Sequence, residues 1–126
     1  MQSAQQIFQL LDSGDINMLA SLLKQDVDKE IRNERGQTPV AAAAARGKVV
    51  MVELLLDHGA DIEGTDKDER TALMLAAMSN HTEVVNLLLR RGARLAATDA
   101  DGHTVLEAAR IAGAPDTIRQ LENLQG

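Results

Sequence analysis

Three stretches of the chain repeat the same residue pattern: Thr38-Pro-Val-Ala-Ala-Ala-Ala44, Thr71-Ala-Leu-Met-Leu-Ala-Ala77 and Thr104-Val-Leu-Glu-Ala-Ala109. Their threonines recur every 33 residues, and a second apolar run follows within the unit, as in Met51-Val-Glu-Leu-Leu-Leu56 and Val84-Val-Asn-Leu-Leu-Leu89. A threonine before a proline or an apolar run is a favourable N-cap, because its hydroxyl accepts a hydrogen bond from a free amide of the first turn. The period therefore predicts an array of paired helices.

The second apolar run of each unit predicts the helix that supplies most of the core. Val52, Leu55 and Leu56 form an i, i+3, i+4 stripe, and the same stripe recurs in the next unit. A glycine follows both of these runs, where a left-handed residue commonly ends a helix. An asparagine or aspartate stands five residues before each repeating threonine, which predicts a hairpin finger between successive units.

With these features, the chain resembles the ankyrin repeat family, whose pattern reads D-x-x-G-x-T-P-L-H-L-A-A-x-x-G-H, an apolar second helix and then G-A-D-V-N. The stretches Asn33-Glu-Arg-Gly-Gln-Thr-Pro39 and Leu54-Leu-Leu-Asp-His-Gly-Ala-Asp-Ile62 are similar to this pattern. The resemblance implies an all-α solenoid of stacked helix-turn-helix units with hairpin fingers. It implies a single domain over residues 1–126, with an N-terminal cap unit (about 1–32), two repeats (33–65 and 66–98) and a C-terminal cap unit (99–126).

Polar residues in the end units predict caps for the array. Gln120 and Glu122 take the positions of Leu54 and Leu56, so we expect the last helix to present them to solvent. At the other end, Ser3-Ala-Gln-Gln6 predicts a capping box at the start of the first helix.

Five residues depart from the family pattern, and three of them, Ala41, Met74 and Glu107, stand at the histidine position of T-P-L-H. Glu107 replaces the histidine of T-P-L-H in the last unit and, with Thr104, predicts a capping box. Glu69 replaces a turn glycine, and a positive φ there carries strain of about 1–3 kcal/mol, which favours another turn in the middle finger. Asn80 also replaces a glycine, but asparagine enters the left-handed region easily.

Composition narrows the function classes. The chain has 126 residues, no cysteine, a net charge of −6 and a single aromatic residue, Phe8. The acidic balance weighs against binding to nucleic acid or anionic membranes, and the missing thiols exclude disulfides and thiolate zinc sites. The start Met1-Gln-Ser-Ala-Gln-Gln6 lacks a secretory signal, so we expect a cytoplasmic protein.

The search for catalytic and metal-binding patterns is negative. His58, His81 and His103 are more than twenty residues apart and have no cysteine partner, so no zinc motif is recognisable. Asp99-Ala-Asp-Gly102 lacks the glycine position and the distal glutamate of a calcium loop, which indicates a turn. No nucleophile elbow, phosphate loop or dinucleotide fingerprint is present. We therefore predict a protein that is not an enzyme and that uses neither a metal nor a cofactor.

The resemblance implies that the chain, as a monomer, binds a partner protein on a concave surface formed by the fingers and first helices. Asp12 and Ser13 extend this surface at its start, and Arg46 and Arg70 are the expected energetic centres. The family's variable contact positions give as candidate partner-binding residues Glu34, Arg35, Gln37, Arg46, Lys67, Asp68, Arg70, Met78, Ser79, Asp101, His103 and Ile111. A partner with acidic groups around a small apolar patch fits these residues, and we expect the chain to act as an inhibitor or an adaptor.

Two alternatives use other features of the chain. The cations of the concave surface could bind a small acidic ligand such as a nucleotide, although no aromatic residue is present there to stack on a base. Separately, Val49 and Val50 place apolar side chains at the start of a second helix on the convex side. Joined to Met51 or Val52, they would form a secondary contact or a dimer site.

Overall fold

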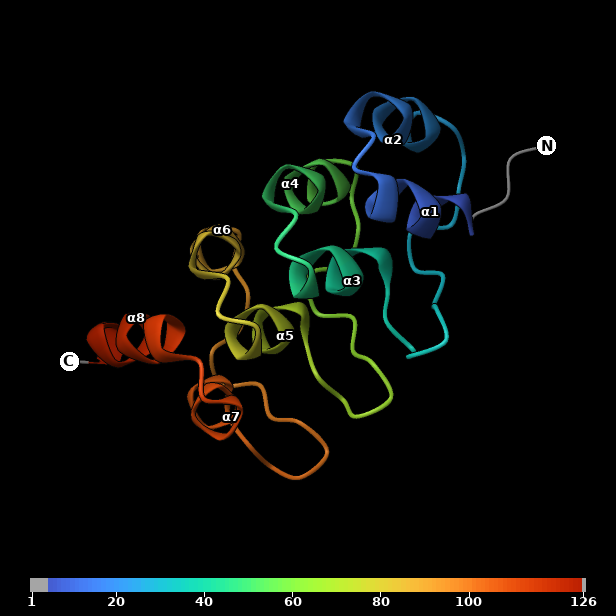
Figure 1. Cartoon of the computed structure of the whole chain (residues 1–126). Coiled ribbons are helices and arrows are strands. Elements are labelled where there is room, and N and C mark those ends of the chain that lie inside the picture. Colours follow the sequence, from blue (N-terminus) through green and yellow to red (C-terminus); the bar gives the residue numbers. More distant parts are fainter. Residues whose placement is uncertain (1–4, 126) are drawn as a thin grey trace.

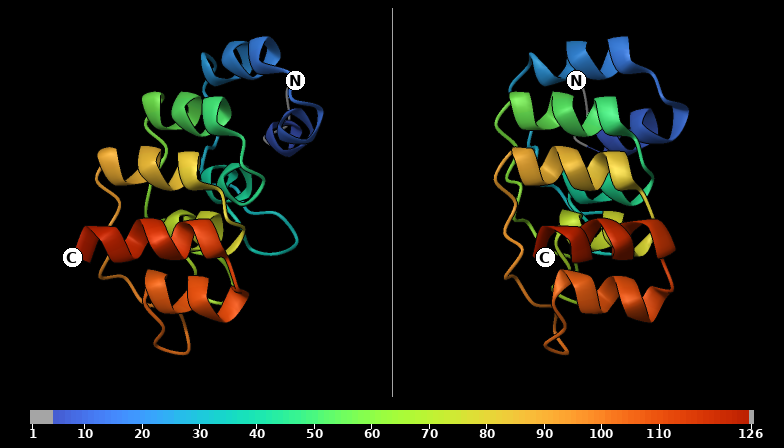
Figure 2. Two further views of the ribbon diagram at one scale, coloured as in Figure 1. Left: turned by 60° about the vertical axis from the view of Figure 1, so that its left-hand side comes forward. Right: turned by 90° about the vertical axis from the view of Figure 1, so that its left-hand side faces the viewer.

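The computed structural model describes residues 5–125, and in this part of the chain eight helices form four consecutive pairs (Figure 1). The first helices of the pairs lie in one layer and the second helices in another, and Figure 2 shows the second helices stacked side by side. Each predicted unit contains one pair. The helices are α1 (Gln6–Ser13), α2 (Ile16–Leu23), α3 (Pro39–Ala45), α4 (Val49–Asp57), α5 (Ala72–Met78), α6 (Thr82–Arg90), α7 (Val105–Ala112) and α8 (Pro115–Gln125).

The repeating threonines cap the first helices, as the sequence predicts. The hydroxyl oxygen of each threonine accepts a hydrogen bond from the amide three residues later, which satisfies one free donor of the first turn. The acceptor and donor pairs are Thr38 and Ala41 (3.3 Å), Thr71 and Met74 (3.2 Å), and Thr104 and Glu107 (3.2 Å). The same hydrogen bond thereby fixes the first turn of α3, α5 and α7.

Two further predictions concern capping boxes. At α7 the carboxylate of Glu107 accepts a hydrogen bond from the Thr104 amide at 3.0 Å, which completes the box and confirms the prediction. The capping box proposed for Ser3-Ala-Gln-Gln6 depends on Ser3, which lies outside the described residues.

The three fingers share one turn. In each, the side chain of Asn33, Asp66 or Asp99 accepts hydrogen bonds from the amides two and four residues later, at 2.8–3.0 Å. Glu69 has a φ of 59° and donates its amide to the Asp66 carbonyl, as the turn glycines of the other fingers do to theirs. The expectation of another turn in the middle finger is therefore wrong: the Asx turn around Glu69 holds it in the left-handed conformation.

The core lies between the two helix layers and is built from small first helices and larger second helices. Residues 40–44 of α3 are buried, and Val52, Leu55 and Leu88 are fully buried, as predicted. Leu56 is only half-buried, while Met51 is buried in its place. Successive residues turn by about 100°, so Met51, Val52 and Leu55 centre on one face, which leaves Leu56 at the edge of that face. Two of the three predicted members of the stripe are therefore correct, and Met51 takes the buried place that was expected of Leu56.

The last helix departs from the predicted cap at one position. Glu122 is exposed and forms an ion pair with Arg110 at 2.8 Å. Gln120, however, is half-buried, and its side-chain amide donates to the carbonyl of Thr82 in α6 at 3.0 Å. The prediction that Gln120 faces solvent is wrong, because its long amide side chain reaches back to the Thr82 carbonyl of the preceding unit.

Asn80 joins the third unit to the fourth. Its side-chain oxygen accepts the amides of Asp116 (2.9 Å) and Thr117 (3.1 Å), two free donors at the start of α8. Its side-chain nitrogen donates to the Asp116 carboxylate at 2.9 Å. The buried hydroxyl of Thr117 donates back to the carbonyl of Ala77 at 2.6 Å. Asn80 has the left-handed φ that the sequence predicts, 63°, and it also caps the helix of the next unit.

The equivalent joint between the second and third units uses different residues. Here a ring nitrogen of His81 lies 3.1 Å from the carbonyl oxygen of Ala45, and Gly47 occupies the position equivalent to Asn80. A side chain at Gly47 would bring a Cβ within 2.7 Å of the His81 ring. In the last unit the equivalent of His81 is Ala114, which leaves room for the side chain of Asn80.

Candidate partner-binding surface

A groove opens between the second and third units, where two fingers stand beside α3 and α5. It has a volume of about 490 Å³ and no enclosing lid. Its floor consists of small or apolar side chains on the two helices, and its walls carry charged side chains from the fingers and from the end of α3. The groove is lined by Arg35, Gln37, Ala42, Ala45, Arg46, Asp66, Lys67, Asp68, Arg70, Leu75 and Ser79.

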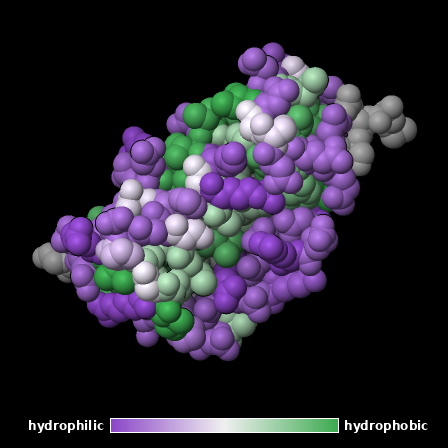
Figure 3. Space-filling view, viewed as in Figure 1, coloured by the Kyte–Doolittle hydropathy of each residue, from purple (hydrophilic) through white to green (hydrophobic). Residues whose placement is uncertain are grey.

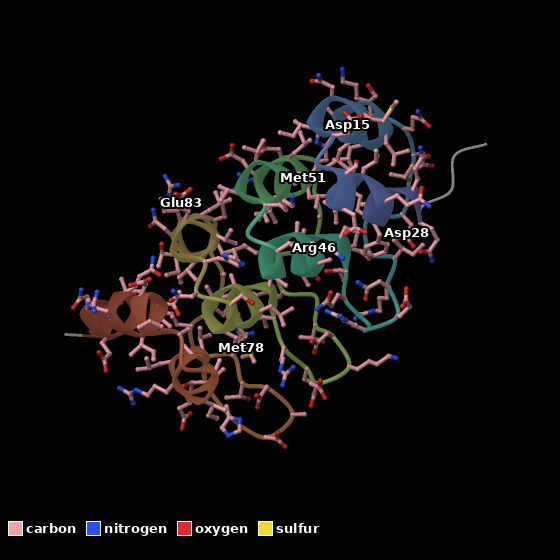
Figure 4. All side chains as sticks on the ribbon, in the orientation of Figure 1. Asp15, Asp28, Arg46, Met51, Met78 and Glu83 are labelled. Atoms are coloured by element: carbon pink, nitrogen blue, oxygen red, sulfur yellow. The ribbon has the colours of Figure 1, made fainter. Side chains whose placement is uncertain are left out.

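Arg46 and Arg70, the two predicted energetic centres, both line this groove. Arg46 follows the last residue of α3 and pairs with Asp12 of α1 at 3.1 Å, whereas Arg70 pairs with Asp68 of its own finger at 3.5 Å. Each arginine side chain keeps 35% of its surface exposed. In Figure 4, Arg46 lies in the layer of first helices, which is the layer next to the fingers. Both guanidinium groups thus face the groove while an aspartate of the same chain holds them.

The remaining predicted residues of the second unit lie at the rim or in the wall. Glu34 and Arg35 are exposed at the finger tip, and the carbonyl of Glu34 accepts a hydrogen bond from the Lys67 ammonium at 2.8 Å. This bond links two successive fingers. Gln37 is only 7% exposed, and its side-chain oxygen accepts from Asn33 at 3.1 Å, so Gln37 supports the finger and presents little surface.

The predicted residues of the third and fourth units extend beyond the groove. Ser79 is an exposed lining residue, but Met78 is half-buried at the end of α5 and does not line the groove (Figure 4). Asp101 is exposed at the tip of the last finger, and Ile111, 67% exposed, lies on α7. His103 pairs with Asp99 at 3.2 Å within its finger. The structure therefore brings seven of the predicted residues together in the groove, and the other five are not part of its lining.

The comparison with protein families decides the assignment. A family model described as ankyrin repeats, in three copies, matches residues 7–99 and 63–124. The chain belongs to the ankyrin repeat family. Ankyrin repeats generally mediate protein–protein interaction and are typically non-catalytic. Among curated proteins, no relative matches the chain.

Sequence reasoning missed the floor of the ankyrin groove. Ala42 and Leu75 lie there at equivalent positions of α3 and α5. The sequence pattern does not distinguish them from core residues, because an apolar residue inside a first helix satisfies that pattern whether or not one edge reaches the surface. A comparison of the repeats does not single out this pair, because Ala41 and Met74 show the same change from small to large and are fully buried.

Two carboxylates of the last ankyrin unit have a lowered pKa. For Asp99, the hydrogen bond from the His103 amide is the largest cause of the lowered pKa, whereas burial of the carboxyl group raises this pKa. For Glu107 the largest cause is the hydrogen bond from the Thr104 amide, followed by the bond with the Thr104 side chain. Both bonds favour the charged form. The lowered pKa values therefore result from the hydrogen bonds of the finger turn and of the helix cap, which stabilise the unit.

The apolar patch predicted around Val49 and Val50 is present, but it includes different neighbours from those expected. Val50 is 53% exposed and Val49 half-buried, but Met51 and Val52 are buried and add little surface. The patch instead continues to Ile16 at the start of α2, around a depression of about 300 Å³. Figure 3 shows a hydrophobic area over α2 and α4, whereas hydrophilic side chains cover the fingers. The patch lies on the opposite helix layer from the groove.

Residues 5–125 contain neither a metal-binding cluster of side chains nor a helix suited to span a membrane. Within this part of the chain, no three histidine, aspartate or glutamate side chains gather where they could hold a metal ion. None of the helices described there combines the length and apolar character that crossing a membrane requires.

Proposed function

We propose that this ankyrin array is a non-catalytic module that binds a partner protein across the fingers and first helices of its two middle units. The observation that carries the proposal is the groove itself. Arg35, Arg46, Lys67 and Arg70 line it in a chain whose net charge is −6. Such a local excess of cations on an acidic molecule favours one orientation of an approaching partner.

The groove also offers the mixture of contacts that interfaces use. Arginine combines charge, several donors and a flat face, and truncation of an interface arginine often costs 2 kcal/mol or more. Leu75 supplies an apolar floor, and Ile111 supplies an exposed apolar side chain at the edge of the surface. Arg46 and Arg70 would form the energetic centre, while Asp101, His103 and Met78 would contribute at the periphery.

The finer aspects of the proposal follow the same reasoning. We propose that the array works as a cytoplasmic monomer and that it acts by occupying a surface of its partner, as an inhibitor or an adaptor. A free nucleotide is the second candidate, because the same cations could bind its phosphates. The only aromatic side chain of the protein, Phe8, is buried in α1 and is not available to stack on a base.

Crosslinking with mass spectrometry in a cell extract tests the proposal. The wild-type chain is compared with the double variant Arg46→Ala/Arg70→Ala and with Arg90→Ala/Arg119→Ala, which removes the same charge from α6 and α8 of the other layer. We expect crosslinks around the groove in the wild type and the control, and their loss in the first variant. Crosslinks that centre on α4 near Val50 and persist in the groove variant would refute the assignment.

A further inference from the structure

We propose that the groove recognises an acidic segment of the partner, two of whose carboxylates replace Asp12 and Asp68 as the ligands of Arg46 and Arg70. Asp12 and Asp68 then act as internal competitors that occupy the site when no partner is bound. This inference rests on the proposed function and specifies the chemistry of the partner.

The balance of charge in the groove supports an acidic ligand. Four cations and two carboxylates, those of Asp66 and Asp68, line the groove. The Asp66 carboxylate is already hydrogen-bonded within its own finger, where it accepts hydrogen bonds from the amides of Asp68 (2.8 Å) and Arg70 (2.9 Å). Since the lining keeps an excess of positive charge, a carboxylate is attracted into the groove and a cation is repelled.

The internal ion pairs are exchangeable. Both aspartates are well exposed, 64% for the Asp12 side chain and 66% for Asp68, and the Arg70–Asp68 distance of 3.5 Å is long for a charge-assisted bond. Exposed pairs of this kind contribute little to stability. An incoming carboxylate that adds further contacts can therefore displace them without unfolding the array.

Arg70 has a donor that its internal partner does not use. Asp68 pairs with Nη1 of Arg70, whereas Nε of Arg70 is buried with no acceptor among the described residues. A carboxylate that pairs with a guanidinium in the two-bond geometry engages two of its N–H groups. Rotation of the guanidinium away from Asp68 would let a bound carboxylate supply the missing acceptor.

The floor of the groove fits the rest of such a segment. Of the helix residues that line the floor, Ala45 is half-buried and Leu75 is 8% exposed, so the side chains that a ligand meets there are short or apolar. They leave space for an apolar side chain next to the acidic ones. The inferred ligand is thus an acidic peptide segment that also carries an apolar residue.

Peptide titrations test the inference. A fluorescein-labelled, end-blocked peptide of sequence EELLEE is titrated with the protein and followed by fluorescence anisotropy, with QQLLQQ as the uncharged control. We expect Asp12→Asn and Asp68→Asn each to strengthen binding of the acidic peptide by about three- to tenfold. Arg46→Ala and Arg70→Ala should each weaken it at least tenfold.

The control variant is Asp57→Asn, which removes the same charge from an exposed pair with Arg91 (2.9 Å) on the other helix layer. It should change the affinity less than twofold. An equal gain in Asp57→Asn and Asp68→Asn would overturn the internal-competitor role, because net charge alone would then explain both. In nuclear magnetic resonance spectra, the Arg70 Nε–H signal should shift on addition of EELLEE and not of QQLLQQ.

Two further outcomes would overturn the inference. One is the absence of EELLEE binding, or equal binding of QQLLQQ. The other is binding of ATP or inorganic phosphate that is at least as tight and depends on the same arginines, which would assign the groove to a free anion. If the peptide fails while a cellular partner still crosslinks to the groove, only the acidic-segment inference is wrong. If crosslinks form elsewhere, the proposed function is wrong as well.

Discussion

Substitution of Asn80 separates two roles that one residue fills. Asn80 adopts a φ of 63°, and its side chain caps α8 through the amides of Asp116 and Thr117. Asn80→Ala removes the cap and leaves a Cβ in the left-handed conformation. Asn80→Gly removes the same cap and relieves the conformation. The difference in the free energy of unfolding between the two variants therefore measures the contribution of the left-handed backbone conformation alone.

The expected magnitudes follow from these contacts. Loss of a side-chain cap costs about 0.5–2 kcal/mol, and the buried position of Thr117 places this case at the upper end. Alanine in the left-handed region adds about 1 kcal/mol. We expect Asn80→Ala to lower the free energy of unfolding by about 2–3 kcal/mol and Asn80→Gly, which loses only the cap, by about 1–2 kcal/mol. At about 4 °C per kcal/mol for a chain of this size, Asn80→Ala should lower Tm by about 10 °C.

Urea unfolding followed by circular dichroism measures both variants, and amide hydrogen exchange locates the effect. The amides of Asp116 and Thr117 should lose protection first, because they lose their acceptor, whereas those of α3 should change little. If Asn80→Gly is as destabilising as Asn80→Ala, the left-handed backbone adds nothing and this part of the reasoning fails. If Asn80→Ala costs less than about 0.5 kcal/mol, water replaces the cap and the joint is not a stabilising contact.

Four further predictions test other parts of the array. Leu88→Ala removes a fully buried side chain from the centre of the stack and should cost about 2–5 kcal/mol in a denaturant melt; an unchanged midpoint would contradict its core position. Glu69→Gly relieves a positive φ at an exposed position and should leave the melting temperature unchanged or raise it, so a clear decrease would reveal contacts of the carboxylate. Because the pKa of Glu107 is lowered in the folded state, its contribution is present above its ordinary pKa of about 4.3 and is lost as the pH falls below it. Glu107→Gln should therefore reduce the loss of stability between pH 5 and pH 2, measured by melts across that range. Gly47→Asn should cost about 1–3 kcal/mol because its Cβ would meet the His81 ring, and adding His81→Ala should recover part of the loss in a double-mutant cycle.

The fold was predictable because its determinants are local and repeated. Thr38, Thr71 and Thr104 cap their helices through bonds that span three residues, and the Asx turns of the fingers span four. Such contacts are encoded in a short stretch of sequence, so a repeating pattern determines them. Glu69 shows where this reasoning was incomplete. Its propensity argued against a left-handed turn, but the two side-chain bonds of Asp66 outweigh the strain.

The groove was only partly predictable, because its character depends on contacts between units. Family positions indicated Arg46 and Arg70, but nothing in the pattern showed that Asp12, more than thirty residues before Arg46, would pair with it. Gln37 occupies a contact position of the family, yet in this chain it turns inward to Asn33. The direction of a long polar side chain depends on which acceptors its neighbours leave free, and a single sequence does not give that.

The two joints between units show how such a dependence can be recognised. Gly47 is followed by a unit with His81, whose ring leaves no space for a Cβ at position 47, whereas Asn80 is followed by a unit with Ala114. A ring at the second position requires glycine at the first, whereas a methyl group leaves space for an asparagine that caps the next helix. The departure of Asn80 from the family pattern is thus compensated by the departure of Ala114. Two apparent irregularities, 34 residues apart, form one alternative way of locking the last unit to the array, and they are expected to change together.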